Sequence, residues 1–259
     1  MEKIIFLGTS RCFPTRLREN SSLYFINGEE DLLVDCGGIS YHKFLAAGID
    51  TSKLKYLVGT HFHPDHCSGI PLLINSLWLS GRTNPLIILG LSPVIQGIKS
   101  LLQIMDYGSW KGLFPLVFEE IEPQFGREAI NNGQFRLTIC PTEHAIPSMA
   151  VKYVSRRTNR IIVYSSDTRP CLNIIKFASG ADIFIRECNY ADDFNERAQR
   201  EGHSTARQVG EEARKIELKD LFLIHHGCDS REEVEKMRKN VGPGSYQIYI
   251  PDDLSSVEI

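Results

Sequence analysis

The sequence has no apolar run long enough to cross a membrane. Its longest run, residues 85–91, is far shorter than the ~20 residues that a membrane helix needs. The first residues lead directly into a strand-like run and have neither the extended apolar stretch nor the small-residue cleavage site of a signal peptide. These absences predict a cytoplasmic protein that has no membrane partner.

Paired cysteines and an excess of one charge are also missing. The seven cysteines are an odd number and none forms a C-x-x-C pair, so we expect free thiols. The formal net charge of −3 gives no electrostatic basis for broad nucleic-acid binding. The arginines of segment 11–18 are expected to lie in a solvated turn. Neither G-x-x-x-x-G-K-[ST] nor G-x-G-x-x-G is present, so the phosphate-cradling nucleotide folds are not supported.

What the chain does contain is alternating strand and helix signals. Its 259 residues are 42% hydrophobic and 24% charged, which is ordinary globular composition. Ile70, Leu73, Ile74 and Leu77 have helical spacing, and Thr205 begins a capping-box pattern. Short apolar runs predict strands at 3–7, 23–26, 31–34, 54–58, 86–89, 135–139, 149–154, 161–164, 182–185, 221–224 and 247–250.

No linker-like stretch or charge run divides the chain, although a second mixed half begins near Gly133. A chain of this length forms one large domain or two small ones. We therefore predict the α/β class, with two sheets sharing one core and helices outside, as an αβ/βα four-layer sandwich. The predicted organisation is a single domain over residues 1–259.

A histidine-rich segment directly follows the strand predicted at 54–58. His61, His63, Asp65 and His66 lie within six positions, which is improbable as a chance cluster for a chain with eight histidines. A strand end followed by a turn projects nearby side chains into one small volume. Imidazoles and a carboxylate are ligands for zinc or another borderline divalent ion. The segment predicts a metal site.

This H-x-H-x-D-H segment resembles the signature of the metallo-β-lactamase superfamily of hydrolases. The accompanying motifs occur in the expected order. The Asp-Cys-Gly-Gly turn at Asp35 resembles the turn that supports the metal site from behind in that superfamily. His144 corresponds to the third histidine motif, Asp167 in Tyr-Ser-Ser-Asp-Thr to the bridging aspartate, and His225 to the last metal histidine. The resemblance covers nearly the whole chain and implies the metallo-β-lactamase fold.

Within the superfamily the sequence is most similar to the tRNase Z (ribonuclease Z and phosphodiesterase) branch. The Phe-Leu-Gly-Thr-Ser segment at Phe6, the Arg-Glu-Cys segment containing Glu187 and the Gly-His-Ser-Thr-Ala segment containing His203 resemble segments of that branch. His225 follows His203 by 22 positions, a spacing associated with the branch. This spacing favours His225 over the adjacent His226 as the ligand.

The chain also departs from that branch. Only 23 positions separate His144 from Asp167, which leaves no room for the protruding arm that grips tRNA in typical members. Arg186 stands where the branch has histidine, and Ile224 where it has threonine before the last ligand. These departures leave the expected metal ligands in place, but they disfavour tRNA as the substrate.

The resemblance implies two divalent metal ions, with Zn²⁺ expected and Mn²⁺ or Fe²⁺ as alternatives. Two such ions would bind a bridging hydroxide, which Asp65 would hold for attack, while His203 and Glu187 would assist the leaving oxygen. The implied ligands fall into two sets that share one bridging aspartate: His61, His63 and His144 for one ion, Asp65, His66 and His225 for the other, and Asp167 as the bridge.

The predicted function is therefore a dinuclear metal-dependent hydrolase, and most specifically a phosphodiesterase acting on a small or cyclic phosphodiester or an RNA end. Three alternatives stay open. They are tRNA 3′ processing, a lactonase, thioesterase or sulfatase on the same scaffold, and a metal-bearing binding module without catalysis. A homodimer is compatible with each of them. Among the remaining candidates, His42 is interpreted as a surface or packing residue, His226 as a group behind the ligands and Cys67 as a buried structural thiol.

Overall fold

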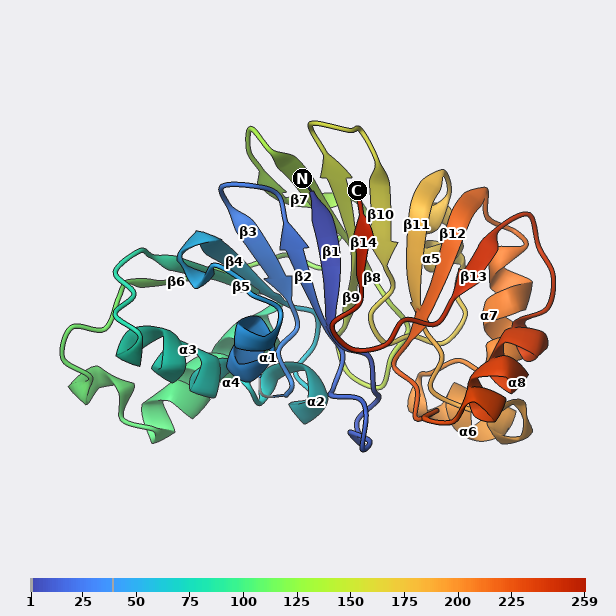
Figure 1. The fold of residues 1–259 in the computed structure, drawn as a ribbon, viewed down its shortest axis with the longest axis horizontal. Coiled ribbons are helices and arrows are strands. Elements are labelled where there is room, and N and C mark those ends of the chain that lie inside the picture. The colour runs from blue at the N-terminus through green and yellow to red at the C-terminus, as the bar shows by residue number, and fades with distance from the viewer. Residues whose placement is uncertain (1, 39) are drawn as a thin grey trace. The chain divides into compact units, whose positions relative to one another are not determined.

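The computed structural model describes residues 2–38 and 40–259. Contacts divide the chain into two compact units. The first comprises Met1–Gly8, Glu19–Glu122 and Asp252–Ile259, and the second comprises Thr9–Arg18 and Pro123–Pro251. Within the described residues, each unit contains one seven-stranded mixed sheet and helices that pack on it (Figure 1). The predicted α/β class is confirmed.

The sheet of the first unit has the order β14-β1-β2-β3-β4-β5-β6. Strands β14 to β3 pair antiparallel, and β3 to β6 pair parallel. Helices α1, α3 and α4 contact one another in sequence, and α4 packs on β5 and β6. The strands are β1 (Lys3–Gly8), β2 (Ser22–Ile26), β3 (Asp31–Val34), β4 (Leu54–Gly59), β5 (Leu86–Gly90), β6 (Leu116–Glu120) and β14 (Ser256–Glu258). The helices are α1 (Ser40–Ala46), α2 (Pro64–Cys67), α3 (Ile70–Leu79) and α4 (Ser92–Ile104), with 3-10 turns η1 (Thr51–Lys53) and η2 (Tyr107–Ser109).

The second unit repeats this plan with the order β13-β12-β11-β10-β9-β8-β7. Here β7 to β10 pair antiparallel and β10 to β13 pair parallel. The strands are β7 (Arg127–Asn131), β8 (Phe135–Pro141), β9 (Met149–Ser155), β10 (Ile161–Tyr164), β11 (Ala181–Glu187), β12 (Leu218–Ile224) and β13 (Gln247–Tyr249). The helices are α5 (Leu172–Ala178), α6 (Asn195–Glu201), α7 (Ala206–Ala213) and α8 (Arg231–Val241), with the 3-10 turn η3 (Asp192–Phe194).

The local sequence signals for helices correspond to the observed helix ends. The Thr205 hydroxyl accepts a hydrogen bond from the Gln208 backbone, and the Gln208 side chain accepts one from the Thr205 backbone, so the predicted capping box begins α7. Helix α3 ends at Leu79, and Gly81 beyond it has a positive φ of 84°. This is the left-handed conformation that glycine adopts after a helix.

Every predicted strand is present, and the three strands that were not predicted lie at sheet edges. Strands β6 and β14 form the two edges of the first sheet, and β7 forms one edge of the second. Their residues are mostly exposed or half-buried. An edge strand pairs on one side only, so it needs little of the apolar patterning that identifies a central strand.

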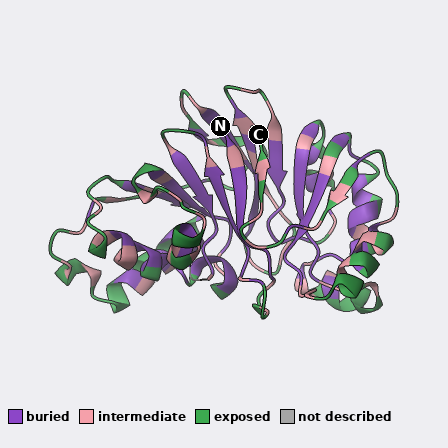
Figure 2. Ribbon diagram, in the orientation of Figure 1, coloured by how far each residue is buried: buried purple, intermediate pink, exposed green. Residues whose placement is uncertain are grey.

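Burial is concentrated in the strands, while the helices keep exposed outer faces (Figure 2). Strand β3 is buried along its whole length, and so are β2 and β4 apart from one half-buried residue each. In the second unit the core includes Val163, Ile174, Phe184, Val209 and Leu221. Among the described residues, no helix combines the length and apolar character required to cross a membrane.

Candidate metal centre

In the first unit, the histidine-rich segment begins immediately after β4. Pro64 occupies the first turn of the short helix α2, and His63 is its N-cap residue. Proline suits this position because its fixed φ matches the helix and its missing N–H would have no partner there. The helix therefore starts inside the motif and places Asp65 and His66 on its first turn. The side chains of His61 and His66 are fully buried, and Asp65 is 8% exposed.

Asp35 holds this segment from the end of β3. Its backbone lies in the left-handed region at φ 61°. Its carboxylate accepts hydrogen bonds from the Thr60 backbone N–H at 2.8 Å, the Thr60 hydroxyl at 2.9 Å and Nδ1 of His66 at 2.8 Å. The last bond fixes the proton on Nδ1 of His66, so Nε2 carries the lone pair that a metal would bind.

The remaining imidazoles of the segment are oriented in a similar way. Because the Thr60 hydroxyl donates to Asp35, it accepts from Nδ1 of His61 at 3.1 Å. Nε2 of His61 then lies 3.1 Å from Nδ1 of His63, and Nε2 of His66 lies 3.5 Å from the Asp65 carboxylate. Ligand atoms of this kind at these separations can share a divalent ion.

Backbone packing behind the segment requires glycine at position 37. A Cβ atom there would lie 1.7 Å from the carbonyl oxygen of Asp65. The turn after β3 therefore approaches the ligand helix more closely than any side chain permits. Cys67 also supports the segment, since its buried thiol donates to the His61 carbonyl at 3.1 Å. Burial raises the pKa of this thiol, consistent with a structural role.

In the second unit, four predicted site residues follow or end strands. His144 lies beyond β8, Asp167 beyond β10 and His225 directly after β12, while Glu187 is the last residue of β11. Because β10, β11 and β12 are parallel, their carboxyl ends meet at one edge of the sheet. His203 joins this edge from the loop before α7.

The unit brings these five residues together in two overlapping groups. Nε2 of His225 lies 3.2 Å from the Asp167 carboxylate, and Nδ1 of His203 lies 3.8 Å from the same carboxylate and 3.5 Å from that of Glu187. Two overlapping sets have ligand atoms within 4.8 Å of one another: His144, Asp167 and His203, and Glu187, His203 and His225. The arrangement can hold a cation and move a proton.

His144 is oriented from behind as the histidines of the first unit are. Its Nδ1 donates to the carbonyl of Gly202 at 2.8 Å, which places the lone pair on Nε2. Burial lowers the pKa of His144, and this effect outweighs the opposing influence of Asp167. A neutral imidazole is the form that binds a metal. A Cβ at Gly202 would lie 2.7 Å from the Cα of His144, so glycine permits this approach.

Arg186 connects the loops that carry these residues. Its fully buried guanidinium donates to the Glu212 carboxylate at 2.8 Å, the Ser204 hydroxyl at 2.7 Å and the Thr168 carbonyl at 3.2 Å. It also lies 3.6 Å from the Glu187 carboxylate. Burial alone would lower the pKa of Arg186, but the two glutamates raise it above its ordinary value. Arg186 thus remains charged and ties together the segments next to Asp167, Glu187 and His203.

The sequence showed Arg186 only as a departure from the tRNase Z pattern, and it did not identify Glu212. One signal for Glu212 was available, because a glutamate stands beside the apolar face of the helix that Thr205 begins. A carboxylate next to such a face needs a buried partner. The partner lies 26 positions away along the chain.

His226 is placed differently from His225. It is buried, and its Nδ1 accepts a hydrogen bond from the Cys228 backbone N–H at 3.2 Å. Burial and the nearby Arg18 lower the pKa of His226 to about 3. His225, by contrast, is next to Asp167. His225 thus lies beside the other candidate ligands of this unit, and its role as a ligand stays a prediction.

The expectation of a solvated turn at segment 11–18 is wrong for Arg18, which is 5% exposed. Its guanidinium donates to the Thr9 hydroxyl at 2.8 Å, the Pro251 carbonyl at 2.7 Å and the Cys228 carbonyl at 2.9 Å. The carbonyls come from segments more than 200 positions away, and burial follows from satisfying them. His42 is exposed, as its interpretation as a surface residue predicted.

The donor set fits divalent metal ions. Each unit supplies imidazoles and carboxylates with little or no side-chain exposure, and hydrogen bonds to Asp35 and Gly202 orient two of the rings with Nε2 as the ligand atom. Ligands held from behind in this way are typical of protein metal sites. Such nitrogen and oxygen donors suit a divalent metal ion.

Comparisons with known proteins agree with this chemistry. The chain is 27% identical to a ribonuclease Z of Methanothermobacter thermautotrophicus, over 100% of this chain and 97% of that protein. It is 28% identical to a ribonuclease Z of Bacillus licheniformis, over 86% of this chain and 87% of that protein. With the ligand groups above, these similarities identify the chain as a metal-dependent hydrolase.

Solved structures show the fold. The metallo-β-lactamase fold protein YhfI from Bacillus subtilis is similar with a TM-score of 0.83 and 23% identity, covering 99% of this chain and 98% of that one. The short form of human tRNase Z is similar with a TM-score of 0.82 and 21% identity, covering 99% of each chain. The metallo-β-lactamase fold implied by the sequence motifs is therefore confirmed.

A family-wide comparison covers most of the sequence. The sequence profile described as anti-Pycsar protein Apyc1 matches residues 2–242 of this chain. The match contains every predicted ligand and the three predicted catalytic residues. The chain therefore belongs to the anti-Pycsar protein Apyc1 family.

Proposed function

We propose that the protein is a phosphodiesterase that uses two divalent metal ions, with Zn²⁺ as the native metal. The ligand sets are those implied by the family motifs. His61, His63 and His144 would hold one ion, Asp65, His66 and His225 would hold the other, and Asp167 would be shared by both. In this proposal residues 1–259 act as one metallo-β-lactamase-like domain.

The position of His203 is the single observation that carries the choice of phosphodiesters. Its Nδ1 lies 3.5 Å from the Glu187 carboxylate and 3.8 Å from that of Asp167. Two carboxylates at this range stabilise a proton on the imidazole. An alkoxide that leaves a phosphodiester needs a proton, and a positioned histidine can supply it. An ester or thioester with a good leaving group has less need of such a donor.

The bound ions would supply an activated water and stabilise the attacking and leaving oxygens of an in-line displacement. The chain's own residues complete the chemistry. Asp65 would orient the nucleophile, and Glu187, 3.5 Å from Nδ1 of His203, would hold the ring so that Nε2 can donate a proton to the leaving oxygen. The Arg186 guanidinium, 3.6 Å from the Glu187 carboxylate, holds that carboxylate in place.

A panel of chromogenic substrates tests the assignment. The metal-loaded protein is assayed with bis(p-nitrophenyl) phosphate, p-nitrophenyl butyrate, p-nitrophenyl sulfate and a lactone. We expect the phosphodiester to be hydrolysed fastest, with activity lost on chelation and restored by Zn²⁺. Faster hydrolysis of the carboxylic ester, sulfate or lactone would favour the other hydrolase classes. No hydrolysis of any substrate by fully loaded protein would favour a binding module.

Metal analysis tests the bridging role of Asp167. Replacing it with Ala removes an anionic ligand that both ions would share, so occupancy should fall from about two ions per chain at both sites together. Elemental analysis of Asp167→Ala and the wild type measures this directly. Asp182→Ala, at a partly exposed carboxylate away from the site, is the matched control. Unchanged metal content in Asp167→Ala would contradict the assignment.

The names of the relatives favour a second candidate, tRNA 3′ processing. Against it, β9 and β10 are joined by only a short turn at 156–160, so no arm projects there. Phosphate contacts dominate nucleic-acid affinity, and a net charge of −3 supplies few of them. We therefore propose weak, salt-dependent tRNA binding. A homodimer would present two 11–18 segments and raise that affinity.

A precursor-tRNA cleavage assay at low and moderate salt distinguishes the two candidates, and analytical ultracentrifugation gives the oligomeric state. Accurate, efficient cleavage at the 3′ junction would promote the tRNase function to first place. We further propose that the protein acts in the cytoplasm, which its seven free thiols support. Family membership extends the proposal to an anti-Pycsar role, tested by whether expression of the chain counteracts Pycsar.

A further inference from the structure

His203 lies on the loop that follows α6, and the end of that helix fixes its backbone. Helix α6 ends at Glu201, and Gly202 follows it with a positive φ of 76°. The His203 backbone N–H then donates to the Ala198 carbonyl at 2.8 Å. Nδ1 of His203 lies 3.5 Å and 3.8 Å from two carboxylates, beyond the about 2.7–3.2 Å of an ordinary N–H···O hydrogen bond. The direction of the imidazole therefore depends on what packs against it.

Tyr190 contacts this loop on both sides of His203. Its backbone N–H donates to the Ser204 carbonyl at 3.2 Å, one position after His203. Its hydroxyl donates to the carboxylate of Glu201, two positions before His203. Burial and this hydrogen bond raise the pKa of Tyr190 to about 12, so the hydroxyl stays protonated as the donor. The Tyr190 ring is 5.9 Å from the His203 ring at an angle of 64°, the edge-to-face arrangement that aromatic rings favour.

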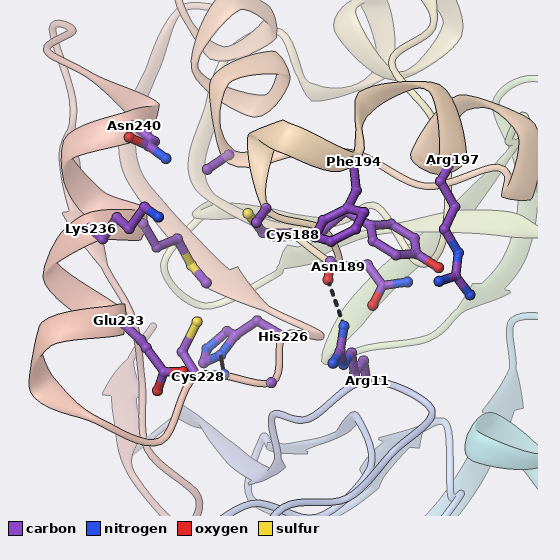
Figure 3. Close-up of a pocket in the computed structure, with 15 residues that line it drawn as sticks. Arg11, Cys188, Asn189, Phe194, Arg197, His226, Cys228, Glu233, Lys236 and Asn240 are labelled. Carbon is purple, nitrogen blue, oxygen red and sulfur yellow. Dashed lines mark hydrogen bonds between the residues drawn. The ribbon is translucent and has the colours of Figure 1, made fainter.

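Arg197 holds the outer end of the Tyr190 side chain. Its Nε donates to the second carboxylate oxygen of Glu201 at 2.9 Å, and its guanidinium lies 5.5 Å from the centroid of the Tyr190 ring. Tyr190, Phe194 and Arg197 also line a cavity of about 410 Å³ that none of the predicted ligands or catalytic residues lines (Figure 3). Because this part of the ring faces open space, a smaller side chain at position 190 leaves no sealed void.

The segment that carries Tyr190 also carries Glu187. The Asn189 backbone N–H donates to the Glu187 carboxylate at 3.0 Å, so the turn after β11 fixes that carboxylate. Tyr190 follows Glu187 by three positions and packs on the ring of His203. One short segment thus places both members of the pair, the carboxylate through a backbone hydrogen bond and the imidazole through an aromatic contact.

We propose that Tyr190 is a positioning residue for His203, whose imidazole it keeps in the direction from which Nε2 can donate to the leaving oxygen. The ring of Tyr190 makes the contact, so phenylalanine serves at this position and an aliphatic side chain does not. A general acid is effective only within hydrogen-bond reach of the atom that it protonates. The role rests on the proposed function, in which His203 supplies that proton.

NMR of the zinc-loaded protein tests the positioning without reference to activity. The ring Cε1–H signal of His203 is assigned by its absence from His203→Ala, and its relaxation and relaxation dispersion report motion of the ring. We expect increased motion in Tyr190→Leu and wild-type behaviour in Tyr190→Phe. Phe194→Leu, which removes an exposed ring 6.4 Å from that of Tyr190, is the matched control and should also resemble the wild type. Unchanged motion of His203 in Tyr190→Leu would overturn the proposal.

Kinetics show whether this positioning serves proton donation. Diphenyl phosphate releases a more basic oxygen than bis(p-nitrophenyl) phosphate and therefore depends more on a general acid. We expect Tyr190→Leu to lower kcat about 10–100-fold for diphenyl phosphate, with little loss for the nitrophenyl ester, an unchanged KM and unchanged metal content. Tyr190→Phe should restore kcat.

Equal losses for the two esters, or no recovery in Tyr190→Phe, would show that position 190 acts only through the stability of the fold and would overturn the proposal. A wild type inactive toward both esters would instead contradict the proposed function. The NMR measurement would then still decide whether Tyr190 positions His203.

Discussion

Replacing Arg186 with Met would leave two buried carboxylates without their guanidinium. Glu212 is 2% exposed and Glu187 is fully buried, and both lie within 3.6 Å of the Arg186 side chain. Removing one partner from a buried ion pair costs about 3–5 kcal/mol, because the remaining charge stays in a low-dielectric environment. Ser204 keeps a partner, since its hydroxyl also donates to the Thr168 carbonyl at 2.9 Å.

The expected loss is therefore about 3–5 kcal/mol for Arg186→Met, a large share of the ~5–15 kcal/mol that stabilises a typical protein. For a chain of this size the same loss corresponds to a decrease in Tm of about 6–20 °C. Arg186→Met with Glu212→Gln removes both charges of the closer pair. We expect this double variant to recover at least ~2 kcal/mol, since no unpaired charge remains at position 212.

Urea denaturation followed by circular dichroism measures these free energies. Arg197→Met is the matched control, because its ion pair with Glu201 is exposed and should contribute less than ~1 kcal/mol. A loss below ~1 kcal/mol for Arg186→Met, or a double variant no more stable than the single one, would refute the buried-charge reasoning. Activity of the folded Arg186→Lys variant reports separately on how the guanidinium positions the loops.

Three other perturbations follow from the structure. His203→Ala should lower turnover by ~10²–10⁴ without changing metal content. The loss of turnover should be smallest for substrates with a nitrophenolate leaving group, and equal losses for good and poor leaving groups would exclude a proton-donor role. Burial lowers the pKa of Lys152, so between this lowered pKa and pH ~10.5 the unfolded chain binds more protons and stability should rise with pH. Lys152→Met should flatten this rise in denaturation curves at pH 7 and pH 10; an unchanged slope would show that Lys152 does not cause it. Gly37→Ala should lower metal content and stability through its clash with Asp65, as measured by elemental analysis and thermal melts. The control Gly133→Ala, whose Cβ would meet no atom within 4 Å, should change neither quantity. Similar behaviour of the two variants would contradict the packing argument.

Local features were accessible from the sequence. The central strands have apolar runs because both of their faces are buried. This need for apolar residues can be read directly from the sequence of each strand. The capping box at Thr205 is equally local, since its two hydrogen bonds join residues three positions apart. The ligand segment from His61 to His66 was recognisable for the same reason, because its residues converge over one strand end and one helical turn.

Other features depend on residues that only the tertiary structure brings together. Three contacts illustrate this: Asp35 accepts from His66, Glu212 pairs with Arg186, and Arg18 donates to backbone carbonyls more than 200 positions away. No local pattern encodes such contacts, because each depends on where two distant strands or loops end. The edge strands β6, β7 and β14 were missed for a related reason, since a neighbouring strand rather than their own apolar pattern keeps them in the sheet.

The sequence by itself determined the residue types of the candidate metal ligands, the central strands and the α/β class, because these depend on composition and spacing within short segments. Only the tertiary structure decided which nitrogen of His66 and of His144 carries the lone pair, since the hydrogen bonds that their Nδ1 atoms donate to Asp35 and Gly202 fix each proton. It likewise decided that His226 lines a separate cavity while the adjacent His225 lies against Asp167. Neighbouring residues in a sequence share composition and spacing, but the direction of each side chain is set by the surfaces that pack around it.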